Sequence, residues 1–143
     1  MPIQQGATNA FKLGLTNGTF DFNTDTFKIA LYTGAANIGA DTAAYTTTGE
    51  TSGTGYVAGG NALTVSVAPT FGAVSSNTTL YLSFDNVTWN PASFTARGAL
   101  IYKDGGGNPT VCVLDFGGDK TATTTFTVQF PAANSTNAII RIA

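Results

Sequence analysis

Few side chains in this sequence are of the types that carry out covalent or acid–base catalysis. The 143-residue chain contains no histidine and a single cysteine, Cys112. Without histidine, the Ser-His-Asp and Cys-His arrangements and all histidine-containing zinc sites are excluded, and one cysteine cannot form a cysteine-rich metal site. Because Cys112 stands within an apolar run, we expect it to be a small buried side chain.

The carboxylates are the remaining candidates for chemistry, and there are eight of them. Paired-acid glycoside hydrolysis stays open in principle, but no Asp or Glu stands in a setting typical of a catalytic acid. Asp21, Asn23 and Asp25 have the alternate spacing of a calcium loop. The Gly that should follow is missing, and Tyr32 stands where the closing Glu belongs, so we interpret this stretch as a plain turn. The glycines at 105–107 lack the lysine of a phosphate loop. The sequence therefore predicts no enzymatic activity, no cofactor and no metal site.

The composition indicates a protein that associates with partners through an uncharged surface. Charged residues make up 10% of the chain, against roughly 25% in ordinary domains, and the formal net charge is −2. This balance offers no basic patch, so we expect no nucleic-acid partner. A surface poor in charge is poorly protected against association, which suits a subunit covered by neighbours and favours a homo-oligomer. Residues 1–5 do not resemble the start of a secretory signal, and no apolar stretch approaches the ~18 residues of a membrane span, so we expect no membrane contact.

The clearest structural pattern is a hairpin over residues 95–116. Two runs of strand length, 95–102 and 110–116, flank a cluster of Gly, Asn and Pro. Both runs are almost continuously apolar, which is typical of strands buried on both faces. Arg97 and Asp115 are the exceptions. The symmetry of the loop places them near each other, so we interpret them as a cross-strand ion pair, with two solvated charges as the alternative.

The rest of the chain predicts further strands separated by turns. Residues 7–16 form either a short helix or an opening strand, and 17–25 form a turn. Residues 26–32 alternate as a half-buried strand. Further strands are expected at 56–57, 61–67, 79–84, 121–130 and 137–142, with a short strand and turn at 85–91 and a turn at 117–120.

This pattern predicts an all-β fold with about eight strands and at most one short N-terminal helix. We expect a single antiparallel β-sandwich, jelly-roll-like, over residues 1–143. The residues expected in one common core are Leu100, Tyr102, Val113, Leu114, Phe126, Val128 and Ile140.

Residues 34–60 are expected to form a long loop or arm without a core of its own. Gly, Ala, Thr and Asn dominate this segment. Loops of this length are usually functional, so we place the surface that contacts a partner here. Tyr45, Glu50 and Tyr56 are the candidate contact residues within it. Trp89, expected to cover a sheet edge or corner, is the fourth candidate.

Several stretches of the sequence resemble a known family. They are FKIALYT at 27–33, AAYTTTGETSGTGYVAGG at 43–60, TARGALIY at 95–102, VLDFGGDK at 113–120, FTVQFPA at 126–132 and NAIIRIA at 137–143. Together they resemble small virion structural proteins of tailed double-stranded DNA bacteriophages.

The resemblance implies a non-enzymatic cement or decoration protein that binds the major capsid protein lattice and copies of itself and stabilises the shell. Such a protein is made in the cytoplasm of the host bacterium and resides in the virion, on the capsid surface. The resemblance also fits a tail, neck or fibre subunit. A host-attachment carbohydrate-binding module is an alternative of another class, and it requires an exposed aromatic platform built from Trp89 and tyrosines.

Overall fold

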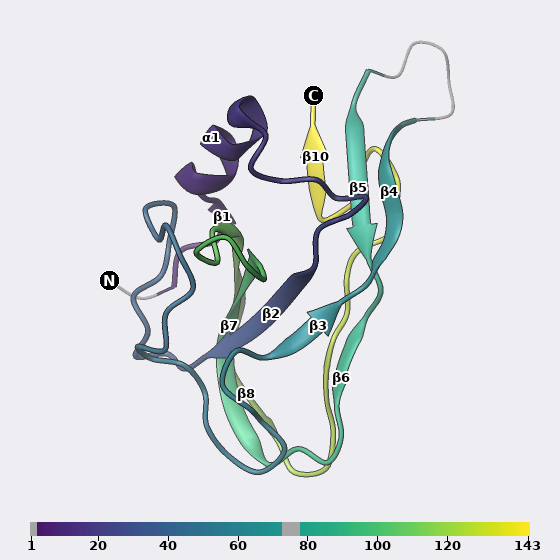
Figure 1. The fold of residues 1–143 in the computed structure, drawn as a ribbon. Coiled ribbons are helices and arrows are strands. Elements are labelled where there is room, and N and C mark those ends of the chain that lie inside the picture. The colour runs from purple at the N-terminus through teal and green to yellow at the C-terminus, as the bar shows by residue number, and fades with distance from the viewer. Residues whose placement is uncertain (1–2, 73–77) are drawn as a thin grey trace.

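The computed structural model describes residues 3–72 and 78–143, which form antiparallel sheets and one short helix near the N-terminus (Figure 1). The mostly β fold is thus confirmed. The elements of the described part are β1 (Gly6–Ala7), α1 (Asn9–Asn17), β2 (Phe27–Tyr32), β3 (Asn61–Leu63), β4 (Val65–Phe71), β5 (Leu80–Phe84), β6 (Val87–Trp89), β7 (Phe94–Lys103), β8 (Thr110–Ala122), β9 (Phe126–Val128) and β10 (Ile140–Ile142).

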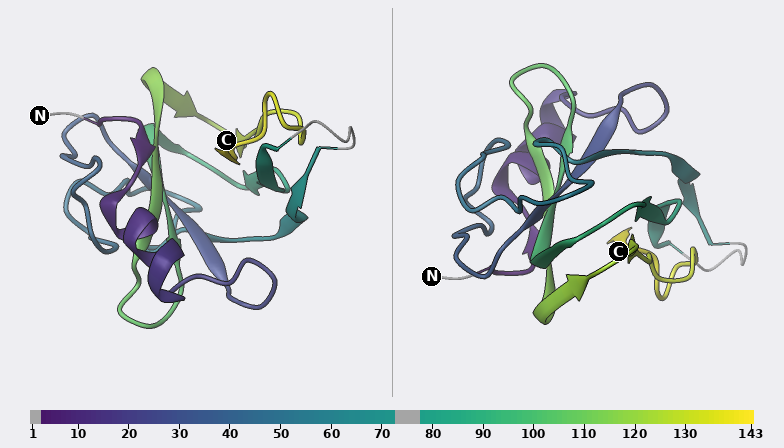
Figure 2. Two further views of the ribbon diagram at one scale, coloured as in Figure 1. Left: turned by 90° about the horizontal axis from the view of Figure 1, so that it is seen from above. Right: turned by 90° about the horizontal axis from the view of Figure 1, so that it is seen from below.

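The strands form three sheets. The largest has the order β1-β8-β7-β2-β3, a second has the order β10-β5-β4, and β6 pairs with β9. The predicted hairpin of β7 and β8 lies in the interior of the large sheet, and most of its apolar run is buried, as its continuous apolar character predicts. Figure 2 shows residues 34–60 on one side of this sheet and the two smaller sheets on the other.

Because the large sheet is covered on both sides, it has two hydrophobic clusters rather than one. Phe126, Val128 and Ile140 belong to the cluster between the sheets, with Leu114 packed against it. Leu100, Tyr102 and Val113 belong to the cluster under residues 34–60. All seven predicted core residues are at least partly buried, but the prediction of one common core is wrong.

The prediction that 26–32 is only half-buried is also wrong. Phe27, Ile29 and Leu31 share one face, which meets the smaller sheets, but Ala30 and Tyr32 are buried as well, on the opposite face. Strict alternation indicates which residues share a face. It does not show whether a loop from elsewhere in the chain covers the second face.

The segment at 117–120 is a bulge and not a turn. In the register of β7 and β8, Gly98 pairs with Asp115 and Ala96 pairs with Lys120, so residues 116–119 lie opposite Arg97 alone. Gly117 has a positive φ of 82°, which glycine adopts without strain. The extra residues are accommodated inside one strand, and β8 therefore runs on to Ala122.

Other predicted boundaries shift by a few residues. Residues 61–67 are divided between β3 and β4, and 121–130 between the end of β8 and β9. Residues 56–57 form no strand. Of the two alternatives for 7–16 the helix is confirmed, since α1 covers Asn9–Asn17 and β1 includes only Ala7 of this stretch. The Thr8 hydroxyl accepts a hydrogen bond from the amide of Phe11 at the start of α1, and Gly18 ends the helix with a φ of 77°.

Candidate functional site

Residues 34–60, here called the clasp, are held along their length by backbone hydrogen bonds. The Thr51 amide donates to the Leu31 carbonyl at 2.9 Å, which attaches the clasp to the end of β2. The Thr110 amide donates to the Ala43 carbonyl at 3.1 Å, which attaches it to the start of β8. The clasp is therefore bound to two strands of the large sheet rather than projecting as an arm.

The clasp also has apolar contacts with the sheet. Ala36 and Ile38 are buried in the cluster formed by the sheet residues Ala30, Tyr32, Leu100, Tyr102 and Val113, together with Ile3, and Tyr45 packs against the same cluster. The segment thus contributes to a cluster that the sheet largely supplies. Most clasp residues are small, and only Ala36 and Ile38 are buried in the cluster, so the sequence does not reveal this packing.

The centre of the clasp is a glutamate that accepts three hydrogen bonds. Tyr45 Oη donates to Glu50 Oε1 at 2.6 Å, and Tyr56 Oη donates to Oε2 at 2.6 Å. The Gly59 amide donates to Oε2 at 2.8 Å. The three residues named from the sequence as contact candidates thus meet at one carboxylate. Hydrogen bonds donated to a carboxylate are charge-assisted, and they are stronger than hydrogen bonds between neutral groups.

Two tyrosines of the large sheet also donate hydrogen bonds to the clasp. Tyr32 Oη donates to the Thr46 carbonyl, and Tyr102 Oη donates to the Gly59 carbonyl, each at 2.6 Å. The rings of Tyr45 and Tyr102 are stacked with centroids 4.8 Å apart. Sequence reasoning missed Tyr32 and Tyr102 as partners of the clasp, although tyrosines placed among buried strand residues need an acceptor for their hydroxyl groups.

Tyr56 has a defined hydrogen-bonding direction. Its oxygen accepts a hydrogen bond from the Leu31 amide at 2.9 Å, so its own proton is free to be donated to Glu50. One tyrosine thus links the backbone of β2 to the carboxylate of the clasp.

The tyrosines of the cluster remain protonated at neutral pH. Burial raises the pKa of Tyr102 to about 12, with the charges of Asp104 and Glu50 adding to the effect. Burial first, and then the hydrogen bond to Glu50, also raises the pKa of Tyr45 and of Tyr56 well above its ordinary value of 10.0. Phenols in this state donate hydrogen bonds and do not serve as bases or nucleophiles. The hydrogen bonds of the cluster therefore hold the clasp on the sheet at neutral pH.

Glycines allow the clasp backbone to lie close to β2 and to the segment between β6 and β7. Gly60 has a φ of 78°, and a Cβ built on it would lie 1.8 Å from the Ile29 carbonyl oxygen. Gly55 has a φ of 86°, and its Cβ would lie 1.8 Å from the Pro91 carbonyl oxygen. Both the backbone conformation and the close approach require glycine at these two positions.

Trp89, the fourth candidate, is a core residue. It is 2% exposed, and its ring packs near those of Tyr56, Phe94 and Phe126. Its indole nitrogen is buried without a hydrogen-bond partner in the described part of the chain. The side chain therefore provides no exposed aromatic platform for a sugar. Contact of any of the four candidates with a partner stays a prediction.

Arg97 and Asp115 lie within ion-pair distance, as the hairpin register predicts. The Arg97 Nε and Asp115 Oδ1 atoms are 3.8 Å apart, and both side chains are about one-third exposed. Arg97 is the residue opposite the bulge, so the pair joins β7 to the bulged part of β8.

The outer surface of the clasp is almost uncharged. Its exposed residues are Gly34, Ala35, Asn37, Ala40, Asp41, Ala43, Ala44, Thr47, Thr48, Ser52, Gly53, Thr54, Gly55, Val57 and Ala58. Asp41 is the single charged member of this set, and Val57 is the large apolar one, with 74% of its surface exposed. Such a surface offers backbone groups, hydroxyls and small apolar side chains to a partner.

Two further features, a group of metal ligands and a membrane-spanning helix, are not found in the described residues. Within residues 3–72 and 78–143, no group of three or more potential ligand side chains is placed to hold a metal ion. No helix in the same ranges has the length and hydropathy needed to cross a membrane. A comparison of the chain with protein-family models, curated proteins and solved structures finds no match to any of them.

Proposed function

We propose that the protein is a non-enzymatic structural subunit of a tailed-bacteriophage virion. In this proposal it is a cement or decoration protein that binds the lattice of the major capsid protein and joins neighbouring subunits. The stretches that resemble such proteins supply β2, most of the clasp, and the strands β7, β8, β9 and β10. The resemblance thus falls on the large sheet and the segment that covers it, and only in part on the two smaller sheets.

The observation that carries the proposal is the outer surface of the clasp. Its exposed residues include a single charged one, Asp41, and the segment is fixed in place by Glu50 and the tyrosines. Ordering a flexible arm on binding would cost about 1–2 kcal/mol per residue. A clasp that is already ordered avoids most of this cost, so small contacts spread over a large area are sufficient for binding. We expect an interface above about 1,000 Å² in total.

The proposal also includes the finer description of the fold as a jelly-roll sandwich. The large sheet packs against β5, β6, β9 and β10 through one aromatic cluster, which supports a sandwich.

Rebinding to stripped virions tests the function. The purified protein is added back at low and high salt, and the bound fraction is measured. Because few ions are released from an uncharged interface, we expect weak salt dependence. Binding that is lost at moderate salt would contradict the proposal. Deleting part of the clasp is unsuitable here, since it would also remove Ile38 and Tyr45 from the core.

A matched pair of substitutions tests which surface is used. Val57→Lys introduces a charge on the clasp, and Gln129→Lys introduces the same charge at an exposed position beyond β9. We expect the first variant to lose rebinding and the second to retain it. Equal rebinding of both variants would show that the clasp is not the interface. A copy number far below that of the major capsid protein would favour the tail, neck or fibre alternative.

A further inference from the structure

The inner face of the second sheet is buried at one end and exposed at the other. In β10, Ile140 is 7% exposed and Ile142 is 39% exposed. In β5, Leu82 is 2% exposed and Leu80 is half-buried. Because Ile140 pairs with Leu82 and Ile142 pairs with Leu80, exposure rises in the same direction along both strands. The apolar face of this sheet therefore extends past the part that the rest of the chain covers.

Phe71 of β4 continues this uncovered row. It pairs with Leu80, which in turn pairs with Ile142. Residues directly opposite one another on neighbouring strands point to the same face of a sheet. Phe71 is 57% exposed, so the row presents three large apolar side chains at the end of the sheet that lies near the C-terminus in Figure 1.

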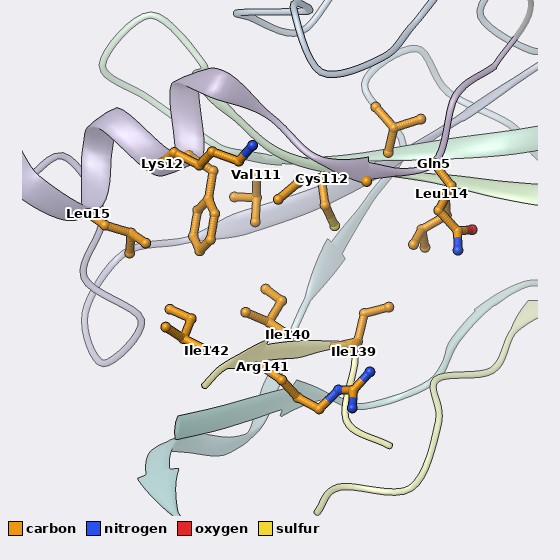
Figure 3. A pocket seen from close by; sticks show the side chains of 14 residues that line it. Gln5, Lys12, Leu15, Val111, Cys112, Leu114, Ile139, Ile140, Arg141 and Ile142 are labelled. Atoms are coloured by element: carbon orange, nitrogen blue, oxygen red, sulfur yellow. The ribbon is translucent and has the colours of Figure 1, made fainter. Parts of the chain in front are cut away.

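A hollow of about 420 Å³ separates this row from α1. Leu15 of α1 lines it on one side, and Leu80 and Ile142 line it on the other. Figure 3 shows Leu15 and Ile142 on opposite sides of the gap and Arg141 directed away from it. Of the five large apolar side chains that are exposed in the described residues, Leu15, Phe71 and Ile142 thus lie at this one opening. An apolar surface of this kind marks a site of interaction.

Opposite charges lie beside the hollow. Asp21 belongs to its lining, and Lys12 lines the adjoining cleft of about 430 Å³, which shares Phe11, Leu15 and Ile142 with the hollow. Asp21 and Lys12 are both exposed, and neither forms an ion pair with another residue of the described chain. A surface that carries one cation and one anion without ion-pair partners is complementary in charge to a copy of itself.

The opening is also complementary to itself in shape. Phe71 provides an exposed ring at the end of the row, and the hollow beside it has an apolar lining that includes Phe11, Phe22 and Leu82. In a two-fold symmetric pair each copy supplies one ring and one hollow, so that both are covered at once. An unrelated partner would need a ring for the hollow and a separate apolar pocket for Phe71.

We propose that two copies of the chain pair through this opening about a two-fold axis. Phe71 of each copy enters the hollow of the other, and Lys12 of each copy faces Asp21 of the other. The clasp lies on the opposite side of the large sheet and stays uncovered (Figure 2). The role of the pair rests on the proposed function, since a dimer with two clasps would hold two neighbouring lattice subunits at once and gain affinity from the linkage.

Sedimentation equilibrium of the full chain over a series of concentrations tests the pairing. We expect a monomer–dimer equilibrium without larger species, because a two-fold interface is closed. Phe71→Asp and Ile142→Asp each place a charge in the apolar interface and should raise the dimer Kd at least about tenfold. Both residues are exposed, so circular dichroism of the variants should match that of the unchanged protein. Unfolding measured far below the dimer Kd is not affected by pairing.

The matched control makes the same substitution on the clasp. Val57 is 74% exposed and lines neither hollow, so Val57→Asp should leave the dimer Kd unchanged. The charges are tested by exchange. Lys12→Glu and Asp21→Lys should each raise the Kd about twofold to fivefold, and the double variant should restore it.

Cross-linking between copies tests the geometry. In a Cys112→Ala background, one preparation carries Phe71→Cys and another carries Leu15→Cys, so a bond between the two positions joins different copies. We expect a short bismaleimide reagent to cross-link this mixture into covalent dimers. A mixture of Val57→Cys with Leu15→Cys should remain monomeric under the same conditions.

Three outcomes would overturn the proposal: a monomer at concentrations up to about 1 mM, equal Kd values for the Phe71 and Val57 variants, or no cross-link between positions 71 and 15. A Kd raised by Val57→Asp and not by Phe71→Asp would place self-association on the clasp and would also overturn it. Because sedimentation needs no virion, its failure leaves the rebinding result unaffected. Conversely, a Val57→Lys variant that fails to rebind should still form the dimer.

Discussion

On the face of the large sheet that meets the two smaller sheets, phenylalanine rings fill the space. Phe27 stacks on Phe22 with ring centroids 4.5 Å apart and lies near Phe20 and Phe84. On the opposite face the clasp is held by tyrosine hydroxyls, which donate to Glu50 and to clasp carbonyls. The first face depends on non-directional burial and the second on directed hydrogen bonds. Substitutions on the phenylalanine face should therefore destabilise the whole fold, and substitutions on the clasp face should detach the clasp alone.

The largest effect is expected on the aromatic face. Phe27→Ala removes a ring that is 1% exposed, and we expect it to lower the free energy of unfolding by about 3–5 kcal/mol. Denaturant unfolding followed by fluorescence measures this change. The matched control is Phe71→Ala, since Phe71 is 57% exposed at the end of β4, and it should change stability by less than about 0.5 kcal/mol. Similar losses in both variants would contradict the placement of the core.

A smaller and more local effect is expected in the clasp. Glu50→Ala removes the acceptor of Tyr45, Tyr56 and the Gly59 amide, and we expect a loss of about 2–4 kcal/mol. Hydrogen exchange should accelerate at the amides of Thr33 and Thr51 while the amides of β5 remain protected.

The control for the clasp is another acid in the same segment. Asp41 is exposed, and Asp41→Ala should leave stability and exchange unchanged. If Glu50→Ala unfolds β5 together with the clasp, the two faces are one cooperative unit and the comparison between them fails.

The stabilisation provided by the clasp tyrosines should also depend on pH in the alkaline range. The pKa of Tyr102 is raised from 10.0 to about 12, so the folded state holds its proton more tightly than the unfolded chain. Its contribution to stability is complete below pH ~10 and is lost as the pH rises toward 12. Burial raises the pKa of Tyr32 and Tyr56 in the same direction. We expect the unfolding free energy to fall in this range.

Cys112 has to be separated from this response. Burial raises the pKa of its thiol to about 12, and its contribution has the same sign. The titration is therefore made in a Cys112→Ala background, with and without Tyr102→Phe. A slope that is unchanged by Tyr102→Phe would show that Tyr102 does not contribute to the alkaline response.

The aromatic face could be predicted from the sequence to a large extent. The alternation of Phe27, Ile29 and Leu31 gives the face of β2, and the continuous apolar runs give the central position of β7 and β8. The clasp could not be predicted in the same way. Its contacts span irregular separations, from 5 residues between Tyr45 and Glu50 to 43 between Gly59 and Tyr102, and no period in the segment marks them.

Two other features depend on strand order, which the sequence does not contain. A Gly-Gly-Asp stretch is typical of a turn, and residues 117–119 become a bulge only because both flanking segments pair with β7. β1 and β10 are end strands of separate sheets, which only the pairing of the whole fold decides. A sequence shows that a segment is a strand, but it does not show which of its edges stays unpaired.

The smallest expected effect belongs to the ion pair of Arg97 and Asp115. The two atoms are 3.8 Å apart, and the Arg97 Nε has no hydrogen-bond partner within the described residues. A partly exposed pair of this kind contributes about 0.2–1 kcal/mol. A double-mutant cycle with Arg97→Ala and Asp115→Ala measures the coupling free energy directly, and the coupling should decrease as salt is added.

Comparing the single substitutions also tests whether an acid of the bulge, Asp119, stabilises Arg97. A Cβ built on Gly34 would lie 3.4 Å from the Arg97 Cδ and 3.5 Å from Asp119 Oδ1, so Asp119 is close to the same arginine at the start of the clasp. If Arg97 interacts with both acids, removing Asp115 alone leaves part of its stabilisation in place. The Arg97→Ala loss should then exceed the Asp115→Ala loss, and a further Asp119→Ala substitution should account for the difference. Equal losses in the two single variants would confine the interaction to Asp115 and leave the bulge without an electrostatic role.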